Sequence, residues 1–255
     1  MRIVVKVGTS TLAHASGRIN IRRVERLCRV LSDLLNYGHE IILVSSGAIG
    51  MGVGKLSLNG KPSDMSTKQA AAAVGQCELM YVYDKEFSEY NHTIAQILIT
   101  NSVVNDKTAH DNFKNTVSKL LEFGVMPVIN ENDTISTEEI EIGDNDTLGA
   151  IVATSTDAEL LIILSDIDGL YDKDPRTNTD AKLIKEVYDI TDDIMIMGKG
   201  KGTNLGTGGM HTKLKAAKIA TEKGIDMVIA NGSDPGILYD IAEGKIVGTR
   251  FYGKK

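Results

Sequence analysis

The chain has 255 residues, which is long enough to bury a sizeable core in one large domain or in two closely packed lobes. Its formal net charge of −6 disfavours a nucleic acid or membrane partner, and the lack of a secretory signal or of an apolar run of about 18 residues predicts a cytoplasmic protein. Cys28 and Cys77 lie far apart, outside any CxxC or Cys/His cluster, so we expect two reduced, buried thiols and neither a disulfide nor a zinc site.

Short apolar runs alternate with segments of helical period along the chain. The runs are rich in Val and Ile and cover residues 3–7, 41–44, 94–99, 125–129, 160–164 and 227–230. This alternation is typical of a parallel or mostly parallel sheet with helices on both faces. We therefore predict an α/β fold, and since no linker or internal repeat interrupts the pattern, no hard domain boundary is visible.

Capping signals place the helices between these runs. Apolar residues recur with helical spacing over 21–35, with Asn20 as the expected N-cap and Gly38 as the expected C-cap. Ser66 and Gln69 have the spacing of a capping box before an alanine-rich run, which predicts a second helix start at Ser66. Further helices are expected over residues 109–123, 146–154 and 210–223.

Three segments combine glycines with a strand end or a helix start. They are residues 6–10 (KVGTS), 45–54 (SSGAIGMGVG) and 206–213 (GTGGMHTK), the last within a long glycine-rich loop over 198–209. Glycine lets backbone N–H groups approach an anion, and a helix N-terminus adds a favourable dipole. Each segment alone fits a tight turn, but three at the edge where open α/β sheets bind ligands predict a phosphate site. Lys6 and Lys213 are its expected cations.

The sequence lacks the common phosphate and nucleophile motifs. It contains no GxGxxG, no complete Walker A, no HExxH and no GxSxG, which argues against Rossmann, P-loop and hydrolase chemistry. The nearest Walker A match, residues 248–255, lacks the final Ser/Thr and a following helix. We interpret it as a frayed basic tail, and we expect the five histidines on the surface or in loops.

Carboxylates and amides gather where a strand ends and the next helix begins. Residues 130–133 (NEND) end a strand and residues 143–147 (GDNDT) open a helix, so their side chains can converge on one pocket. Asp144 is best explained as a helix cap. Asp133, Asn145 and Asp146 could instead orient ammonium groups, hold a substrate amine or anchor Mg²⁺ through water.

A second polar segment, residues 165–176 (SDIDGLYDKDPR), follows the most apolar run. It could be a surface loop with an Asp-Gly turn at Asp168 and Gly169. Its position after a strand favours nucleotide binding, with Tyr171 as an apolar wall.

Taken in chain order, these motifs resemble the amino acid kinase family. The matching segments are VKVGTS, VSSGAIGMG, KQAAAAVGQ, PVINENDT, GDNDTLGA, SDIDGLYDKDPR and GTGGMHTKLKAA, which extend over nearly the whole chain. The resemblance implies a three-layer αβα sandwich with a mainly parallel sheet of about eight strands. It also implies one amino acid kinase domain, with a glutamate-binding lobe over about residues 1–155 and an ATP-binding lobe over about residues 156–255.

Within the family, the motifs most resemble members that phosphorylate the γ-carboxylate of glutamate with ATP, the first step of proline biosynthesis. The resemblance then makes Lys6 and Lys213 the lysines that stabilise the transferred phosphoryl group and Asp146 the residue that organises them. It implies substrate contacts from Ser46, Gly47, Asn130, Asp133 and Asn145. It implies nucleotide contacts from Lys6, Gly8, Thr9, Ser165, Asp166, Tyr171, Thr207, Gly208, Gly209, Met210, His211, Thr212 and Lys213. Mg²⁺ would be held mainly by ATP phosphates and water, without a protein metal site.

Two local differences from the family pattern are Ser165, where threonine is usual, and His211, where serine is usual. Many bacterial members also carry a carboxyl-terminal PUA domain, and because this chain ends where that domain would begin, we expect a short form without it. The resemblance further implies a homo-oligomer (a dimer or a tetramer), proline as a feedback inhibitor and glutamyl phosphate reductase as a downstream partner.

Two alternatives remain open from the sequence. The first is a kinase of the same fold that acts on carbamate, N-acetylglutamate, aspartate or UMP. Asp133 favours a free amino acid, because an α-ammonium group needs a carboxylate partner. The second is a non-catalytic sensor, against which the two lysines and Asp146 argue, since a sensor need not stabilise a transferred phosphoryl group.

Overall fold

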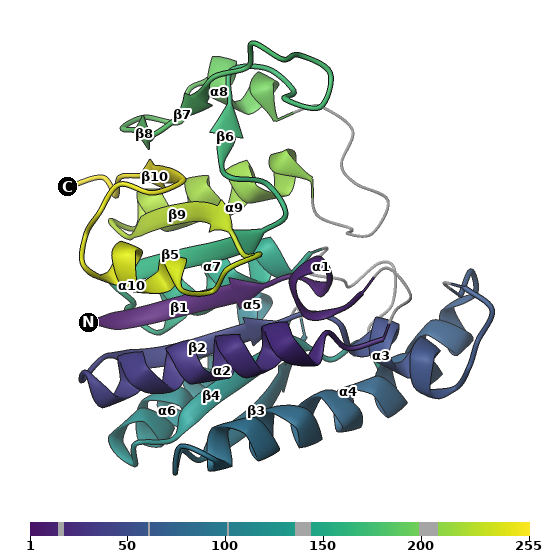
Figure 1. The fold of residues 1–255 in the computed structure, drawn as a ribbon. Helices are drawn as coiled ribbons and strands as arrows, with labels where there is room; N and C mark the ends of the chain where they lie inside the picture. The colour runs from purple at the N-terminus through teal and green to yellow at the C-terminus, as the bar shows by residue number, and fades with distance from the viewer. Residues whose placement is uncertain (15–17, 61, 101, 136–143, 199–208) are drawn as a thin grey trace.

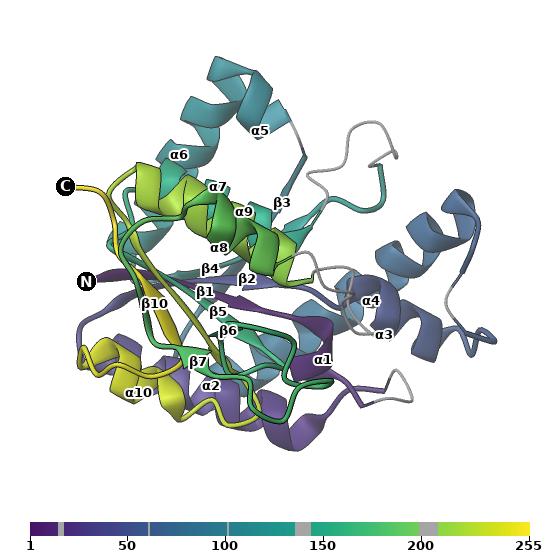
Figure 2. The ribbon, with the colours of Figure 1, turned by 90° about the horizontal axis from the view of Figure 1, so that it is seen from above.

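The described residues form three layers. The computed structural model describes residues 1–14, 18–60, 62–100, 102–135, 144–198 and 209–255. In this part of the chain an eight-stranded sheet lies between two layers of helices (Figure 1). Figure 2, which looks from above, separates the helices on the two sides of the sheet.

The strands of the central sheet are almost all parallel. They are β1 (Arg2–Val7), β2 (Glu40–Ser45), β3 (Ile94–Ile99), β4 (Met126–Glu131), β5 (Leu160–Ser165), β8 (Glu186–Val187), β9 (Asp226–Asn231) and β10 (Thr249–Phe251). Their order is β3-β4-β2-β1-β5-β9-β10-β8, and among the described strands only β9 and β10 pair antiparallel in this sheet. A separate pair contains β6 (Leu170–Tyr171) and β7 (Leu183–Ile184). All six predicted strands are confirmed, with ends that differ by at most two residues.

Helices cover both faces of the sheet. On one face lie α2 (Ile21–Asn36), α4 (Met65–Ser88) and α10 (Ile237–Ala242), and on the other lie α6 (Lys107–Glu122), α7 (Asn145–Ser155) and α9 (Met210–Glu222). Shorter helices are α1 (Thr9–Leu12), α3 (Ala48–Lys55), α5 (Ser102–Asn105) and α8 (Asp192–Met197). No helix in the described ranges is both long and apolar enough to cross a bilayer.

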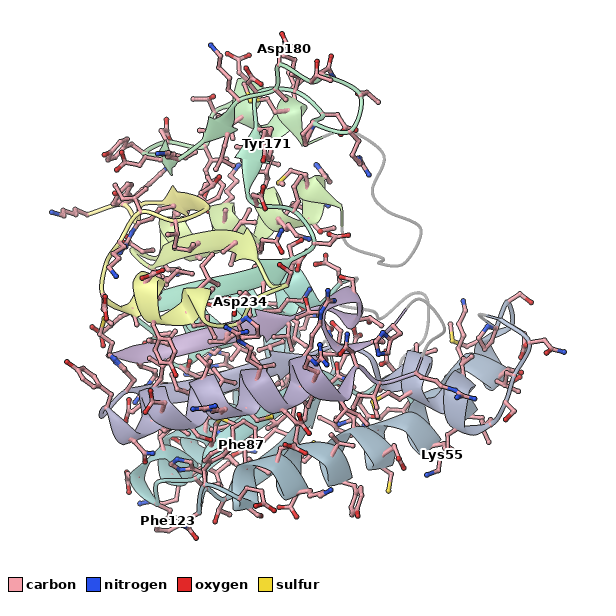
Figure 3. The ribbon with its side chains drawn as sticks, in the orientation of Figure 1. Lys55, Phe87, Phe123, Tyr171, Asp180 and Asp234 are labelled. Atoms are coloured by element: carbon pink, nitrogen blue, oxygen red, sulfur yellow. The ribbon has the colours of Figure 1, made fainter. Side chains whose placement is uncertain are left out.

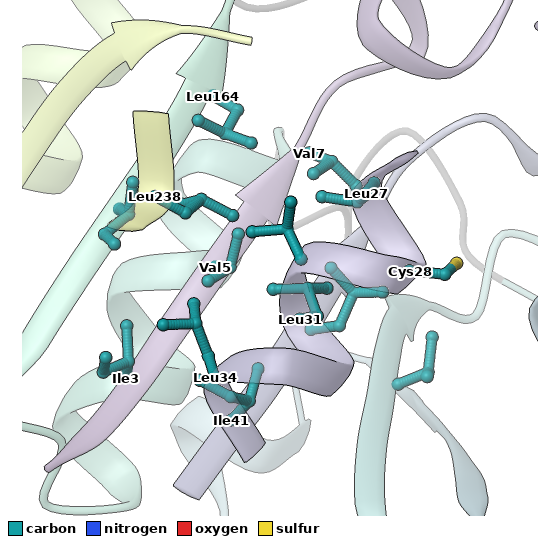
Figure 4. Packing of buried hydrophobic residues seen from close by; sticks show 14 of the residues in the cluster. Ile3, Val5, Val7, Leu27, Cys28, Leu31, Leu34, Ile41, Leu164 and Leu238 are labelled. Carbon is teal, nitrogen blue, oxygen red and sulfur yellow. The ribbon is translucent and has the colours of Figure 1, made fainter. Parts of the chain in front are cut away.

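Side-chain alternation in β1 divides the core into two halves. Ile3, Val5 and Val7 pack against α2, together with Leu27 and Leu31 of that helix (Figure 4). Val4 belongs to the opposite core, which α6, α7 and α9 cover, and Lys6 shares its face. Each buried Val, Leu or Ile contributes about 1.5–3 kcal/mol relative to an exposed one. Because both faces are buried, β1 holds Lys6 firmly against the layer of α7.

Two capping predictions have different outcomes. Asn20 is the N-cap of α2 and accepts a bond from the backbone N–H of Arg23 at 3.2 Å, as predicted, while Gly38 follows the C-cap residue Tyr37 with φ +94°. The predicted start of α4 at Ser66 is wrong. The helix begins at Met65, and Asp64 is its N-cap, accepting from the backbone N–H of Thr67 at 2.8 Å. Asp64 takes the cap because its negative charge is favourable at a helix N-terminus, and the Ser66 hydroxyl donates to its Oδ1 at 2.8 Å.

The segment over residues 45–54 is not the glycine-rich loop that we predicted, because α3 begins at Ala48. Gly47 has φ +108° and starts the helix. At Gly52, a Cβ atom would lie 1.8 Å from the carbonyl oxygen of Ala71 in α4, and at Gly75 it would lie 1.8 Å from that of Ala48. These two glycines therefore serve backbone-to-backbone packing of α3 on α4.

Two further expectations are wrong. The carboxyl-terminal segment is not frayed: Phe251 of β10 is fully buried, and Arg250 forms an ion pair with Asp226 at 2.7 Å. Cys28 is buried as expected, but Cys77 is exposed because it lies on the outer side of α4, and both are free thiols.

Replacing Gly52 with alanine should destabilise the protein by about 3 kcal/mol, because the added methyl group overlaps the backbone of Ala71. Gly50→Ala, in the same helix, should change stability by less than about 1 kcal/mol, because the new Cβ would meet Thr9 Cγ2 at an ordinary 3.5 Å. Urea unfolding of both variants measures the difference. Equal stabilities would contradict the packing role of Gly52.

Candidate active site

Polar residues gather at the carboxyl ends of the parallel strands, on the side of the sheet where α1 and α3 lie in Figure 1. Lys6 is the penultimate residue of β1, and Ser46 follows β2. Asn130 lies near the end of β4, and Ser165 ends β5. Parallel strands bring these ends to one edge, which is where open α/β sheets bind ligands.

Asp146 joins the two lysines that the sequence singled out. Its Oδ1 lies 2.7 Å from Lys6 Nζ, and its Oδ2 lies 3.0 Å from Lys213 Nζ. The three side chains come from β1, α7 and α9, so they are brought together only by the fold. With two ammonium groups and one carboxylate, the cluster carries a net charge of +1 and can attract an anion.

The cluster is almost completely removed from solvent. The exposed fractions are 7% for Lys6, 1% for Asp146 and 5% for Lys213. Burial by itself raises the pKa of the Asp146 carboxyl, but the charges of Lys6 and Lys213 outweigh it and lower this pKa to about 2. Asp146 is therefore ionised at neutral pH and remains an anionic anchor for both lysines.

The start of α9 completes this side of the site. Thr212 Oγ1 lies 2.8 Å from Asp146 Oδ2 and 2.8 Å from the carbonyl oxygen of Gly209, which is the N-cap residue of α9. No side chain in the described residues caps this helix, so its first N–H groups, which include those of Met210 and His211, can bind an anion.

The first glycine loop lies beside the lysines. A Cβ atom at Gly8 would lie 3.6 Å from Lys6 Nζ, so the backbone of Gly8 lies close to this ammonium group. Thr9 is close to the second loop, because a Cβ atom at Gly47 would lie 4.0 Å from Thr9 Oγ1. The loops that follow β1 and β2 are thus neighbours at the strand ends.

A network of amide hydrogen bonds lies next to this cluster. Asn145 Nδ2 donates to Ser46 Oγ at 2.8 Å and to Asn130 Oδ1 at 3.0 Å. Asn130 Nδ2 donates in turn to Gln76 Oε1 at 2.9 Å. The network joins α7, β4 and α4, and it lies directly beside the charged cluster because Asn145 and Asp146 are consecutive. Asp144, as expected, caps α7 by accepting from the backbone N–H groups of Asp146 and Thr147.

A small pocket opens to solvent beside this network. Its walls are Ala48, Ala72, Gln76, Leu98, Glu131, Asn132, Asp133 and Thr134. Asp133 is half-buried and supplies a carboxylate, whereas Gln76 is buried at the pocket wall. The pocket wall therefore offers both a carboxylate acceptor, from Asp133, and an amide, from Gln76.

The residues expected to contact ATP lie farther along the same edge. Ser165 pairs in register with Asn231 of β9, and its hydroxyl donates to Asp166 at 3.3 Å. Tyr171 is half-buried and donates to Asp168 Oδ2 at 3.0 Å. In Figure 3, Tyr171 lies between the central sheet and the outer segment that carries Asp180. Two other predicted contacts, Thr207 and Gly208, fall outside the described residues.

Two polar residues in these clusters were missed in the sequence. Gln76 lies in the quoted segment KQAAAAVGQ, and as a single polar side chain at the end of an alanine-rich run it was a usable signal. Asn231, whose Nδ2 donates to Asp168 at 2.7 Å, had no such signal, since it simply ends a strand.

The described residues contain no group of three or more His, Cys, Asp or Glu side chains that could hold a metal ion. The donors at the site are ammonium, amide, hydroxyl and backbone N–H groups, which suit an anion. A divalent cation here would have to take most of its ligands from a bound phosphate and from water.

Comparison with known proteins decides the family. The sequence model that describes the amino acid kinase family matches residues 1–231 of this chain. The chain belongs to the amino acid kinase family. A glutamate 5-kinase from Clostridium perfringens is 57% identical, over 100% of this chain and 96% of that relative. A glutamate 5-kinase from Caldanaerobacter subterraneus subsp. tengcongensis is 53% identical, over 100% of this chain and 68% of that longer relative.

Solved structures of the same fold are more distant in sequence. The carbamate kinase from Giardia lamblia bound to AMP-PNP has a TM-score of 0.71 at 16% identity, covering 99% of this chain and 98% of that one. The UMP kinase from Bacillus anthracis has a TM-score of 0.66 at 15% identity, covering 100% of this chain and 96% of that one. The predicted family and its three-layer fold are both confirmed.

Replacing Asp146 with asparagine should destabilise the protein by about 3–5 kcal/mol, because two buried ammonium groups lose their counter-charge. A matched control is Asp157→Asn. Asp157 forms an exposed ion pair with Lys114 at 2.7 Å, and its φ of 53° suits asparagine, so the loss should stay below about 1 kcal/mol. Denaturant unfolding at neutral pH gives both values.

The stability difference between the wild type and Asp146→Asn should also depend on pH. The folded pKa of Asp146, about 2, lies below its ordinary value of 3.8, so its stabilising contribution is complete above about pH 4 and is lost as the pH falls through 2. The stability difference between the wild type and Asp146→Asn should therefore narrow between pH 4 and pH 2. A difference that stays constant over this interval would contradict the ion-pair assignment.

Proposed function

We propose that the protein transfers the γ-phosphoryl group of MgATP to the γ-carboxylate of L-glutamate, giving L-glutamyl 5-phosphate and ADP. The observation that carries this proposal is the buried Lys6–Asp146–Lys213 cluster, held beside the Ser46–Asn145–Asn130 network. The full-length similarity to glutamate 5-kinases supports the choice of substrate.

The chemistry needs positioning and positive charge. A glutamate side chain has a pKa near about 4.3 and is already ionised at neutral pH, so the nucleophile requires no general base. The barrier comes from bringing this carboxylate against a polyanion. Lys6 and Lys213 approach the Asp146 carboxylate from two different elements, and they can stabilise the charge that spreads over the phosphoryl oxygens during transfer.

The amide network and the pocket suit the amino acid end of the substrate. Ser46 Oγ accepts from Asn145, which leaves its own O–H able to donate to a carboxylate. Asp133 can pair with an α-ammonium group at the pocket wall. These groups favour a free amino acid over N-acetylglutamate, carbamate or UMP, none of which carries such an ammonium group.

The nucleotide would lie along the ends of β5 and β9. Ser165, Asp166 and Tyr171 could contact the nucleoside, while Gly8, Thr9 and the start of α9 at Gly209 could contact the phosphates. Mg²⁺, bound to the phosphates and water, would neutralise part of their charge. This assigns glutamate to the lobe over about residues 1–155 and ATP to the lobe over about residues 156–255.

The proposal includes a cellular setting. The reaction would be the first step of proline biosynthesis in the cytoplasm, carried out by a homo-oligomer that proline inhibits. Its product is an acyl phosphate, which water hydrolyses, so a reductase such as glutamyl phosphate reductase must consume it promptly.

Replacing Lys213 with alanine should lower kcat about 10²-fold to 10³-fold, because one main electrostatic donor to the transferred group is lost. Lys6→Ala should have an effect of the same size. Lys215→Ala is the matched control, since Lys215 is an exposed residue of the same helix and should leave kcat within about twofold. Steady-state ADP release measures all three, and near-normal turnover by either site variant would defeat the proposed role.

A substrate panel tests the proposal directly. ADP release with MgATP is compared for glutamate, aspartate, N-acetylglutamate, carbamate and UMP, and hydroxylamine traps any acyl phosphate as a hydroxamate. Glutamate should give the highest kcat/KM and a trapped product. If another acceptor were preferred, the glutamate assignment would fail while the kinase class remained.

A further inference from the structure

Gln76 is the one member of the amide network that α4 supplies. It is 7% exposed, and it follows an alanine-rich stretch in which Ala71 and Ala72 are buried. Alternation along β4 places Asn130 on the α4 face of the sheet with Val128, opposite the face that Lys6 shares with α7. The bond between Gln76 and Asn130 therefore links the far helix layer to the site.

The orientation of every amide in this network follows from one backbone group. The backbone N–H of Glu131 can only donate, and it lies 2.9 Å from the side chain of Asn130, so the atom that faces it is Oδ1. Asn130 Nδ2 then points to Gln76, which must present Oε1 as the acceptor. Asn145 must present Nδ2 to Asn130 Oδ1, and the same Nδ2 reaches Ser46 Oγ.

We infer that Gln76 is a positioning residue for the amino acid substrate, acting through Asn130 and Asn145 on the Ser46 hydroxyl. By accepting from Asn130 Nδ2, Gln76 holds the Asn130 amide in the orientation that accepts from Asn145. Asn145 is thereby kept as a donor to Ser46 Oγ, and the Ser46 O–H is directed toward a ligand as a donor. This inference rests on the proposed function.

The same arrangement gives Gln76 a direct role at the pocket. Its Oε1 is engaged by Asn130, so its Nε2 group is the end that can donate to a ligand in the pocket, which Gln76 lines together with Asp133. An α-carboxylate needs donors and an α-ammonium needs an acceptor. Gln76 and Ser46 supply donors for the α-carboxylate, and Asp133 supplies an acceptor for the α-ammonium group. This set matches the two charges of a free α-amino acid.

The test is Gln76→Met, which keeps the length of the side chain and removes both its acceptor and its donor. We expect the KM for glutamate to rise about tenfold, because the buried Asn130 donor is left unsatisfied and the network loses its fixed direction. The KM for ATP should change by less than twofold. Gln96→Met, at an exposed glutamine of the neighbouring strand β3, is the matched control and should leave both constants unchanged.

A double-mutant cycle separates positioning from a general structural effect. If Gln76 acts in part through Asn145, adding Gln76→Met to Asn145→Ala should raise the KM for glutamate by clearly less than the tenfold rise expected in the wild-type background, because only the direct contact of Gln76 remains to be lost. Multiplicative effects, or an equal rise in the KM for ATP, would overturn the inference. Gln76→Asn, which stays polar but is too short to reach Asn130, repeats the test if the Met variant does not fold.

The outcomes distinguish the two levels of the proposal. If the wild-type protein did not use glutamate, the proposed function would fail first and the inference with it. If it did use glutamate and a folded Gln76 variant kept the wild-type KM, only the inference would fail. Failure of both Gln76 variants to fold would assign Gln76 to the fold and would overturn the inference as well.

Discussion

The site depends on one carboxylate that is shared by two buried ammonium groups. Asp146 lies 2.7 Å from Lys6 Nζ and 3.0 Å from Lys213 Nζ, and it is 1% exposed. Burial of three charges is costly unless each is paired at short range. Strand β1 and helices α7 and α9 must therefore be positioned relative to one another with a precision of a fraction of an ångström. Close packing of the core between them provides this precision.

The opposite layer of the sandwich contributes to the same site by a different physical means. Helix α4 packs on α3 through Gly52 and Gly75, where no side chain would fit between the two backbones. The start of α3 at Ala48, two residues after Ser46, is fixed in this way. Gln76, one residue beyond Gly75, then reaches Asn130 at 2.9 Å. Gly52, which belongs to a segment that resembled a phosphate loop in the sequence, thus acts through helix packing, and the contact of α3 with α4 brings Ala48 and Gln76 to the wall of one pocket.

Much of the fold could be predicted from the sequence, because local patterns determine it. Buried parallel strands appear as continuous Val and Ile runs, and α2 is bounded by Asn20 and Gly38 in a way that propensity alone explains. Two of the failures occurred where tertiary contacts decide the structure. Helix α3 contains three glycines and is stabilised by its packing on α4, while the short strand β10 exists because its residues pair with β9 on one side and with β8 on the other.

The site shows the same division. Lys6, Asp146 and Lys213 could be named from the sequence because charged residues at strand ends and helix starts have few structural explanations. Their pairing followed from the resemblance to the family and not from any local pattern, since it joins residues 67 positions apart between Asp146 and Lys213. The amide network was harder still, because an amide gives no sign in sequence of which atom it will present. Only the fixed donor at Glu131 N determines that Asn130 accepts on one side and donates on the other.

Charge also explains why the site must be local and enclosed. The whole chain has a formal net charge of −6, which repels both ATP and glutamate. The buried Lys6–Asp146–Lys213 cluster, at the carboxyl ends of the strands, has a net charge of +1. A buried +1 charge acts through a lower effective dielectric than an exposed one, so it is felt strongly at a few ångströms and is screened beyond about 8–10 Å in physiological salt. Asp146 therefore limits the excess positive charge to a single unit. That is enough to favour an incoming phosphoryl group, yet the lysines remain paired, and fixed in place, when no anion is bound.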